Sequence, residues 1–297
     1  MSIEIIPVSP VCGAEVRGVE MKRPLDPEAA ERLDRALAEF GVLLFRGQPL
    51  SPVELTAFAR HFGPLQPHVQ RKYQHPEAPE VVIMTNRKPD GSFDDAGAHR
   101  GAMEETRDGW HSDLSYDPVP AKATLLHSVE VPSRGGNTCF ANVAKLYADL
   151  PDELKARIDG RQAEFWYGGH SRNKKTMLAS SALDAEGQKT AHAVHPVVNV
   201  HPITGKPAIY VNPLITTRIV GLSDAESDAI LETLFDWMDR PEYRWEHLWA
   251  VGDTLMWDNR GGLMHTGRLD YPRDEPRRFI RTTVSGVPTV MHRAGAA

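Results

Sequence analysis

The sequence predicts a single, mainly β domain of the β-sandwich or jelly-roll type, with a few helices on its outside. Three observations predict it: many short strand-like runs bounded by turn residues, a few amphipathic segments with helix caps, and no regular strand–helix alternation. No internal repeat or linker divides the 297 residues, and 41% of them are apolar, enough for one sizeable core. We therefore expect one domain over residues 1–297 and not a doubly wound α/β fold.

The first sixty residues are predicted to contain three short strands and two helices. Residues 3–25 alternate apolar and polar side chains between turn residues, which predicts two short strands. Residues 26–41 begin with Asp-Pro-Glu and end with glycine, the usual signals for the start and end of a helix. Residues 42–45 are all apolar and predict a buried strand. Residues 51–62 begin with a Ser-Pro-Val-Glu capping box, which predicts a second helix.

The middle of the chain is less regular. Residues 64–109 are poor in periodicity and rich in proline, glycine, aspartate and histidine, and a loop of this length usually has a function. We expect this segment to cover an active site, together with residues 163–220, which mix strand-like runs with polar loops. Residues 121–131 predict a strand, and residues 151–158 a short helix.

The last third is predicted to be one helix followed by strands. Residues 223–238 start with a Ser-Asp-Ala-Glu capping box and carry apolar side chains at helical spacing. Four strand-like runs follow, at residues 243–248, 254–257, 263–265 and 279–285.

Composition excludes several classes of partner. The net charge of -6 is spread along the chain without a basic stripe, which argues against binding to nucleic acid. No run of 18 apolar residues is present, so no membrane association is expected. The N-terminus lacks the features of a signal peptide, and the two cysteines, Cys12 and Cys139, cannot form a disulfide framework. These observations predict a cytoplasmic protein.

The stretch Trp110-His111-Ser112-Asp113 is the first candidate for chemistry. If it is a strand, His111 and Asp113 point to the same side and can provide two neighbouring metal ligands. A third ligand is then needed, because two histidines and one carboxylate form the facial triad of non-haem Fe(II) oxygenases. Since a His-x-Asp pair is expected about once by chance in a chain of this composition, a hydrogen-bonded surface pair is the alternative.

The C-terminal third contains the possible partners. His265 follows a glycine-rich turn, and the strand-like run beyond it places Arg277 and Arg281 on one face. Two arginines on one buried face are costly unless each meets an anion, and guanidinium is well shaped to bind a carboxylate. The alternatives are that His265 is a core histidine and that the arginines pair with acidic residues or lie in solvent.

Several blocks of the sequence, in this order and spacing, resemble the taurine dioxygenase/TfdA family of Fe(II)- and 2-oxoglutarate-dependent dioxygenases. The resemblance covers nearly the whole chain. The blocks are Phe45-Arg46-Gly47-Gln48, Phe62-Gly63-Pro64-Leu65, Trp110-His111-Ser112-Asp113, Gly135-Gly136-Asn137-Thr138, Phe140-Ala141-Asn142, Trp257-Asp258-Asn259-Arg260 with His265, Asp270-Tyr271, Arg277 and Arg281.

The resemblance implies a double-stranded β-helix (jelly-roll) core and a role for each residue in these blocks. It implies that His111, Asp113 and His265 bind Fe(II) and act in catalysis. It further implies that Arg277 and Thr138 bind the distal carboxylate of 2-oxoglutarate, which reacts with O2 to give succinate and CO2.

On the substrate side, the resemblance implies binding roles for three further residues. They are Arg281, for an anionic group, with His68 and Phe140. We expect a small substrate with a carboxylate or sulfonate, because Arg281 would otherwise be an unpaired charge inside the barrel. Aryloxyalkanoates and amino-acid-derived carboxylates are the alternatives. Since relatives in this family are often dimers or tetramers, a homo-oligomer is expected.

Two readings from other classes remain open. A non-catalytic jelly-roll protein could use the same three ligands for a bound metal, but it gives no reason for Thr138 and Arg277. A Zn-dependent hydrolase could also use the three ligands, but it would need a nearby general base and no keto acid.

Overall fold

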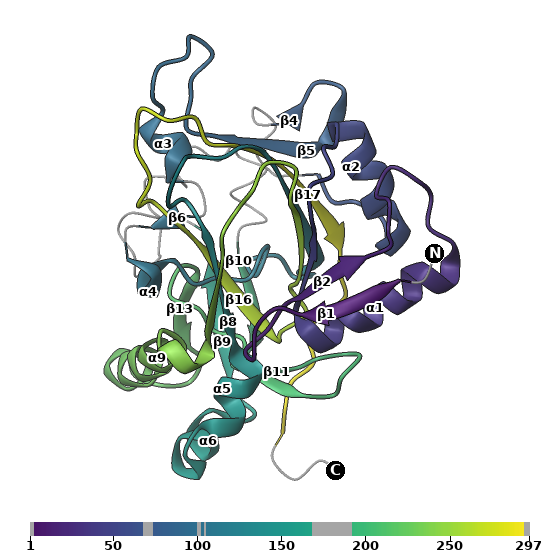
Figure 1. Ribbon diagram of the computed structural model, residues 1–297. Helices are drawn as coiled ribbons and strands as arrows, with labels where there is room; N and C mark the ends of the chain where they lie inside the picture. Colours follow the sequence, from purple (N-terminus) through teal and green to yellow (C-terminus); the bar gives the residue numbers. More distant parts are fainter. Residues whose placement is uncertain (1–2, 68–73, 100–101, 104, 168–191, 294–297) are drawn as a thin grey trace.

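The structure is a computed structural model, which describes residues 3–67, 74–99, 102–103, 105–167 and 192–293. Two facing β-sheets form its centre (Figure 1). The larger has eight strands in the order β1-β2-β3-β15-β7-β17-β5-β4, and the smaller has four in the order β14-β8-β16-β6. This is the arrangement of a jelly-roll core with helices outside it, as the sequence predicts.

The strands of the large sheet come from both ends of the chain. They are β1 (Glu4–Pro7), β2 (Ala14–Arg17), β3 (Val42–Phe45), β4 (Gln74–His75), β5 (Ala78–Thr85), β7 (Ala121–Glu130), β15 (Thr254–Asp258) and β17 (Arg278–Ser285). β15 lies between β3 and β7, antiparallel to both, and β17 lies antiparallel between β7 and β5. The small sheet contains β6 (Ala102–Met103), β8 (Thr138–Asn142), β14 (Arg244–His247) and β16 (Leu263–Arg268).

Side-chain alternation divides the core into layers. Leu43 and Phe45 of β3 belong to a cluster that the helices α1 (Pro27–Phe40) and α2 (Pro52–Ala59) cover, whereas Val42 and Leu44 point the other way. The second cluster also contains Phe140 of the small sheet, so it fills the space between the two sheets. Because successive strand residues face opposite sides, one apolar strand contributes to both layers.

The outer face of the small sheet carries the remaining elements. These are α4 (Thr106–Gly109), α5 (Val143–Asp149), α6 (Asp152–Ile158), α9 (Asp224–Met238), β9 (Gln162–Trp166), β10 (His192–Pro196), β11 (Val198–Val200), β12 (Pro207–Ile209) and β13 (Thr216–Ile219). The short helix α3 (Asp95–Ala98) is the exception, because it lies beside β5 in the large sheet. Two 3-10 turns, Arg60–Phe62 and Pro241–Tyr243, complete the described elements. In Figure 1, α5, α6 and α9 lie on the opposite side of the molecule from α1 and α2.

The helix caps form as the sequence predicts. The Ser51 and Ser223 side chains each accept from the backbone N–H three residues later, and Glu54 and Glu226 complete the two capping boxes. Two predictions were wrong or incomplete. Residues 64–109 contain β5, a full strand paired with β17, and α5 was not predicted at all. Among the described helices, none has the length and apolar character needed to span a membrane.

Candidate metal centre and anion pocket

His111, Asp113 and His265 converge at the mouth of the space between the two sheets. One potential ligand atom from each lies within 4.8 Å of the others. His111 forms an isolated β-bridge with His265 on β16, in which each backbone N–H donates to the other residue's carbonyl at 3.0 and 2.9 Å. All three residues are buried. The structure therefore brings together the three side chains that the sequence singled out.

The segment around His111 is not the strand that we expected. Only His111 is bridged, and the chain then turns, with Leu114 at a positive φ of 56°. A positive φ is unusual for a side chain such as leucine and marks a local conformation that the surrounding structure imposes. The turn, and not strand alternation, therefore sets Asp113 beside His111.

The two imidazoles present unprotonated nitrogens. His111 Nδ1 lies 2.7 Å from the Gly109 carbonyl, which can only accept, so Nδ1 carries the proton and Nε2 keeps its lone pair. Burial lowers the pKa of His111, and burial together with the nearby charge of Arg281 lowers the pKa of His265 well below its usual value. Neutral imidazoles are the form that binds a metal ion.

The carboxylate of Asp113 accepts hydrogen bonds from three distant segments. Thr124 Oγ1 and Trp257 Nε1 donate to Oδ2 at 2.6 and 3.2 Å, and Arg281 Nη2 donates to Oδ1 at 2.8 Å. Burial alone would raise the pKa of Asp113, but the charge of Arg281 and the hydrogen bond from Thr124 lower it below its usual value. Asp113 is therefore an anion with a fixed orientation, as a metal ligand requires.

Arg281 has a different electrostatic environment from the one that we expected from the sequence. We expected an unpaired charge, and that premise is wrong, because Arg281 forms an ion pair with Asp113 and its side chain is only 15% exposed. Its Nε is buried without a partner among the described residues. The guanidinium still lines the cavity, so it can donate to a further anion.

Asn259 is a contributor that the sequence analysis did not single out. Its Oδ1 accepts from the Asp113 backbone N–H at 3.1 Å, and its Nδ2 donates to Thr124 Oγ1 at 3.0 Å. Since Thr124 in turn donates to Asp113, one amide orients both the backbone and the carboxylate of the ligand. The Trp-Asp-Asn-Arg block contains this residue, but its partners are more than a hundred residues away in the chain.

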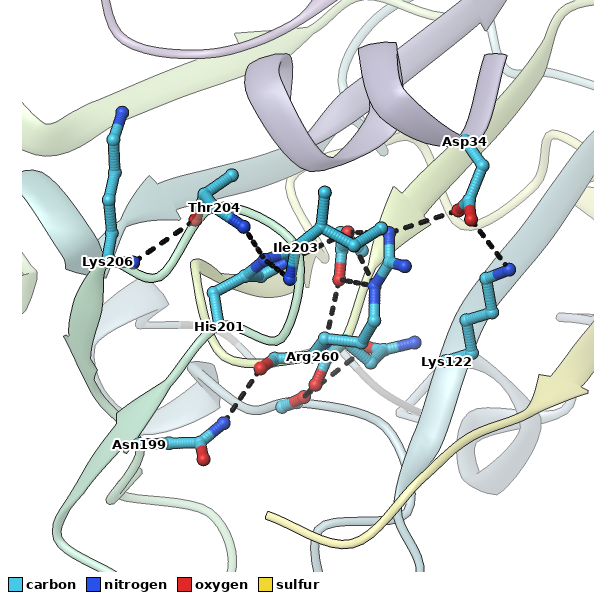
Figure 2. A network of polar contacts seen from close by, with 11 residues as sticks. Asp34, Lys122, Asn199, His201, Ile203, Thr204, Lys206 and Arg260 are labelled. Carbon is cyan, nitrogen blue, oxygen red and sulfur yellow. Dashed lines mark hydrogen bonds and ion pairs between the residues drawn. The ribbon is translucent and has the colours of Figure 1, made fainter. Parts of the chain in front are cut away.

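A buried polar network fixes the turn that carries Asn259 (Figure 2). The Arg260 guanidinium binds Asp258 and reaches Asp34 on α1 at 3.2 Å. The Arg260 carbonyl accepts from Asn199, and His201 Nε2 lies 3.2 Å from Asp258 Oδ2. Paired and hydrogen-bonded charges of this kind define one conformation of the turn.

A second polar region lies beside the three ligands. Arg277 Nε donates to the Gly136 carbonyl at 3.1 Å, and its guanidinium carbon lies 4.3 Å from the Phe279 ring centre. Burial lowers the pKa of Arg277 to about 10. Among the described residues, no carboxylate forms an ion pair with Arg277, and its terminal nitrogens donate to no protein group. A half-buried cation without a counter-ion is the signature of an anion site.

Two of the three candidate ligands, His111 and His265, line one cavity together with Arg277 and Thr138. Its polar lining consists of His111, His265, Thr138, Arg277 and Arg281. Met84, Leu126 and Phe279 give much of the remaining wall an apolar character. A cavity with mostly apolar walls and a few convergent polar groups is typical of a small-molecule site.

Two sequence predictions are not placed in this cavity. Phe140 is fully buried behind His265, with ring centres 6.4 Å apart, and it does not belong to the lining of the cavity. It packs against the ligand instead. His68 lies outside the described residues.

With this geometry established, comparison with known proteins is decisive. The family model described as "Taurine catabolism dioxygenase TauD, TfdA family" matches residues 4–283. The chain belongs to this family. It is thus a non-haem Fe(II)- and 2-oxoglutarate-dependent dioxygenase by family membership.

Curated relatives of this dioxygenase span the whole chain. The (S)-phenoxypropionate/alpha-ketoglutarate-dioxygenase of Sphingobium herbicidovorans is 32% identical, over 97% of this chain and 96% of the relative. The alpha-ketoglutarate-dependent 2,4-dichlorophenoxyacetate dioxygenase of Cupriavidus pinatubonensis is 30% identical, over 95% of this chain and 98% of the relative.

Solved structures agree on the fold. The crystal structure of AAD-2 in complex with Mn(II) and N-oxalylglycine has a TM-score of 0.80 and 30% identity, covering 98% of this chain and 100% of that one. A putative alpha-ketoglutarate-dependent taurine dioxygenase from Burkholderia xenovorans has a TM-score of 0.80 and 28% identity, over 98% of this chain and 92% of that one.

The residues of this dioxygenase fit the groups on which its family depends. Two neutral imidazoles and one oriented carboxylate form a ligand set suited to Fe(II) with open positions. In the same cavity, the Arg277 guanidinium, which has no counter-ion within the described part of the chain, is suited to a dicarboxylate. Both features arise from side chains of this chain.

Proposed function

We propose that His111, Asp113 and His265 bind Fe(II), and that Arg277 and Thr138 bind the distal carboxylate of 2-oxoglutarate in the same cavity. The observation that carries the proposal is that Arg277, which has no counter-ion among the described residues, lines the same cavity as His111 and His265, the two histidines that converge with Asp113. A jelly-roll protein that only binds metal, or a zinc hydrolase, has no use for this cation.

When bound, Fe(II) and 2-oxoglutarate supply the oxidation, in which O2 provides one oxygen atom to succinate and one to a C–H bond of the substrate, with release of CO2. The protein binds and orients. Gly109 keeps the proton on His111 Nδ1, so that Nε2 faces the metal position, and Thr124 and Trp257 fix the Asp113 carboxylate. Leu126, Phe279 and Met84 exclude water from the cavity.

We propose a small anionic substrate, with a carboxylate or sulfonate that Arg281 binds. The remaining N–H groups of Arg281 can donate while Nη2 stays on Asp113. Phenoxypropionate and 2,4-dichlorophenoxyacetate, in the names of two relatives, are carboxylates, and another relative from Acinetobacter baylyi is called an alkylsulfatase. Hydroxylation of an aryloxyalkanoate, followed by cleavage of the C–O bond, is therefore one candidate reaction, and hydroxylation of an amino-acid-derived carboxylate is another.

His68 remains a predicted contact to the same substrate. A homo-oligomeric state, a dimer or tetramer, is also proposed and is measurable by light scattering.

Anaerobic addition of Fe(II) and then 2-oxoglutarate tests the reaction class. A weak visible charge-transfer band is expected in the wild type, and Arg277→Leu should bind the metal but require far more 2-oxoglutarate to develop the band. A screen for succinate release with taurine, aryloxyacetates, alkyl sulfates and amino acids then identifies the substrate class. Absence of both the band and succinate release would contradict the proposal.

Arg281→Ala tests the substrate anion. Loss of a charge-assisted hydrogen bond should raise KM for the substrate about 10- to 100-fold, with little change in 2-oxoglutarate affinity. Arg278→Ala is the matched control, because Arg278 lies on the same strand with an exposed side chain. Metal affinity is measured in parallel, since Arg281 also contacts Asp113. An unchanged KM in Arg281→Ala would remove the argument for an anionic substrate.

A further inference from the structure

Trp249 contacts two residues that line the cavity, Thr138 and Phe279, although it does not line the cavity itself. It follows β14 in the chain, and its Nε1–H donates to Thr138 Oγ1 at 3.1 Å. Its ring packs edge-on against Phe279, with centres 4.8 Å apart. The Arg277 guanidinium carbon lies 4.3 Å from the centre of the same Phe279 ring. One side chain therefore contacts the hydroxyl donor directly and reaches the guanidinium through one ring.

The hydrogen bond to Trp249 determines what the Thr138 hydroxyl can do. A hydroxyl has one proton to donate and two lone pairs that accept. Indole N–H is only a donor, so the bond to Trp249 uses a lone pair of Thr138 and leaves its proton free. Within the described part of the chain, the Thr138 hydroxyl donates to no protein group. Thr138 is 3% exposed and lines the cavity beside Arg277, so its proton is available to a ligand there.

The backbone next to Thr138 orients Arg277 in a parallel way. The Gly136 carbonyl accepts from Nε of Arg277, and neither terminal nitrogen donates to another of the described residues. Thr138 and Gly136 belong to the same segment, where β8 begins between β14 and β16. The segment therefore contributes the Thr138 hydroxyl as a donor and orients the Arg277 guanidinium beside it. A lone pair of the hydroxyl accepts from Trp249, and Nε of the guanidinium donates to Gly136.

We propose that Trp249 is a positioning residue for the dicarboxylate, because its indole N–H makes the Thr138 hydroxyl a donor toward the cavity. The inference rests on the proposed function, in which Thr138 and Arg277 bind 2-oxoglutarate. Without the indole N–H, the hydroxyl is free to rotate away and the ligand loses a donor that was already oriented. The packing of the ring against Phe279 is a separate contribution, which a phenylalanine at position 249 retains in part.

The test is calorimetric titration of 2-oxoglutarate into the Zn(II)-loaded protein, which binds without turnover. Trp249→Phe should raise the Kd for 2-oxoglutarate about three- to tenfold, the effect of one net hydrogen bond. Its Zn(II) affinity should equal that of the wild type, because Trp249 contacts none of the three ligands. Trp245→Phe is the matched control: Trp245 stacks on Phe140 and makes no side-chain hydrogen bond among the described residues. It should leave the Kd for 2-oxoglutarate unchanged.

A double-mutant cycle separates positioning from general packing. In a Thr138→Val background the hydroxyl is absent, so Trp249→Phe should change the Kd for 2-oxoglutarate by less than about 1.5-fold. An equal increase in both backgrounds, or an effect matched by Trp245→Phe, would overturn the inference while the proposed function stands. A wild type that binds Zn(II) but no 2-oxoglutarate would overturn the proposed function itself, and the inference with it.

A spectroscopic measurement keeps the inference testable if Trp249→Phe does not fold. The indole N–H resonance of Trp249 in the Zn(II)-loaded protein should move on addition of 2-oxoglutarate, since the acceptor hydroxyl becomes polarised. It should move little in Thr138→Val, and Thr138→Ser should restore the wild-type shift. An indole resonance that does not respond to the ligand in the wild type would contradict the inference.

Discussion

Thr124→Val tests whether a metal ligand depends on side chains that never touch the metal. The substitution keeps the shape of a buried strand residue and removes one hydroxyl. That hydroxyl donates to Asp113 Oδ2 at 2.6 Å and accepts from Asn259 Nδ2 at 3.0 Å. The change therefore removes a charge-assisted hydrogen bond and leaves a buried amide N–H without its acceptor.

Typical values for such contacts give the expected size of the effects on metal affinity and on stability. A hydrogen bond to a charged group contributes about 1.5–3 kcal/mol, and partners that orient a ligand typically change metal affinity about 10- to 100-fold. The Kd for Zn(II) should therefore rise by about tenfold or more. The free energy of unfolding should fall by about 1–3 kcal/mol, because Asn259 Nδ2 is left buried and unpaired.

Two assays measure these effects independently. Competition with a chromophoric chelator reports the Kd for Zn(II), and urea denaturation of the metal-free protein reports the free energy of unfolding. Thr282→Val is the matched control in the same sheet, because Thr282 is 1% exposed and its hydroxyl has no partner among the described residues. It should leave metal affinity unchanged and stability equal or up to about 1 kcal/mol higher. A folded Thr124→Val variant that binds Zn(II) like the wild type would refute the reasoning.

Two further substitutions probe the surroundings of the site. Gly109→Ala should lower the free energy of unfolding by about 1–3 kcal/mol and weaken Zn(II) binding, because the new Cβ would clash with Thr266 Oγ1 beside the carbonyl that orients His111. Gly262→Ala, with open space around its Cβ, is the control in the same denaturation and chelator assays. Equal behaviour of the two variants would contradict this expectation. Burial lowers the pKa of His127 to about 4, so the unfolded chain takes up a proton that the folded chain does not as the pH falls from 6.5 to 4. The free energy of unfolding should fall by at most about 3 kcal/mol over that window and level off below it. His127→Gln should reduce this slope in urea denaturation between pH 4 and 7, and an unchanged slope would refute the assignment to His127.

Local signals in the sequence predicted many of the helices and strands, although not β5 or α5, and the ordered sequence blocks identified the candidate site residues. Capping boxes and proline positions predicted α1, α2 and α9, because these signals act within one turn of the helix itself. Alternation predicted β7, β15 and β17 for a similar reason. The blocks around His111, His265 and Arg277 identified the candidate ligands and the guanidinium, and the structure brings them to one cavity.

What the sequence could not determine is which side chain meets which. The environment of Asp113 comes from Thr124, Trp257 and Arg281, which lie on three strands far apart in the chain. Periodicity shows which face of a strand is buried but not the element that covers it. For this reason Arg281 was expected to lack a partner, and its ion pair with Asp113 emerged only from the packing of β17 beside β7.

The same distinction explains the contributions of Asn259 and Trp249. Each is an ordinary polar or aromatic residue in the sequence, without a spacing that marks its role. Each acquires that role from hydrogen bonds across more than one hundred residues, to Asp113 and to Thr138. The sequence by itself determined most of the helices and strands and the chemically reactive groups, because both depend on local composition. Only the tertiary structure decided how those groups are oriented, because hydrogen bonds and charge pairs depend on distances in space.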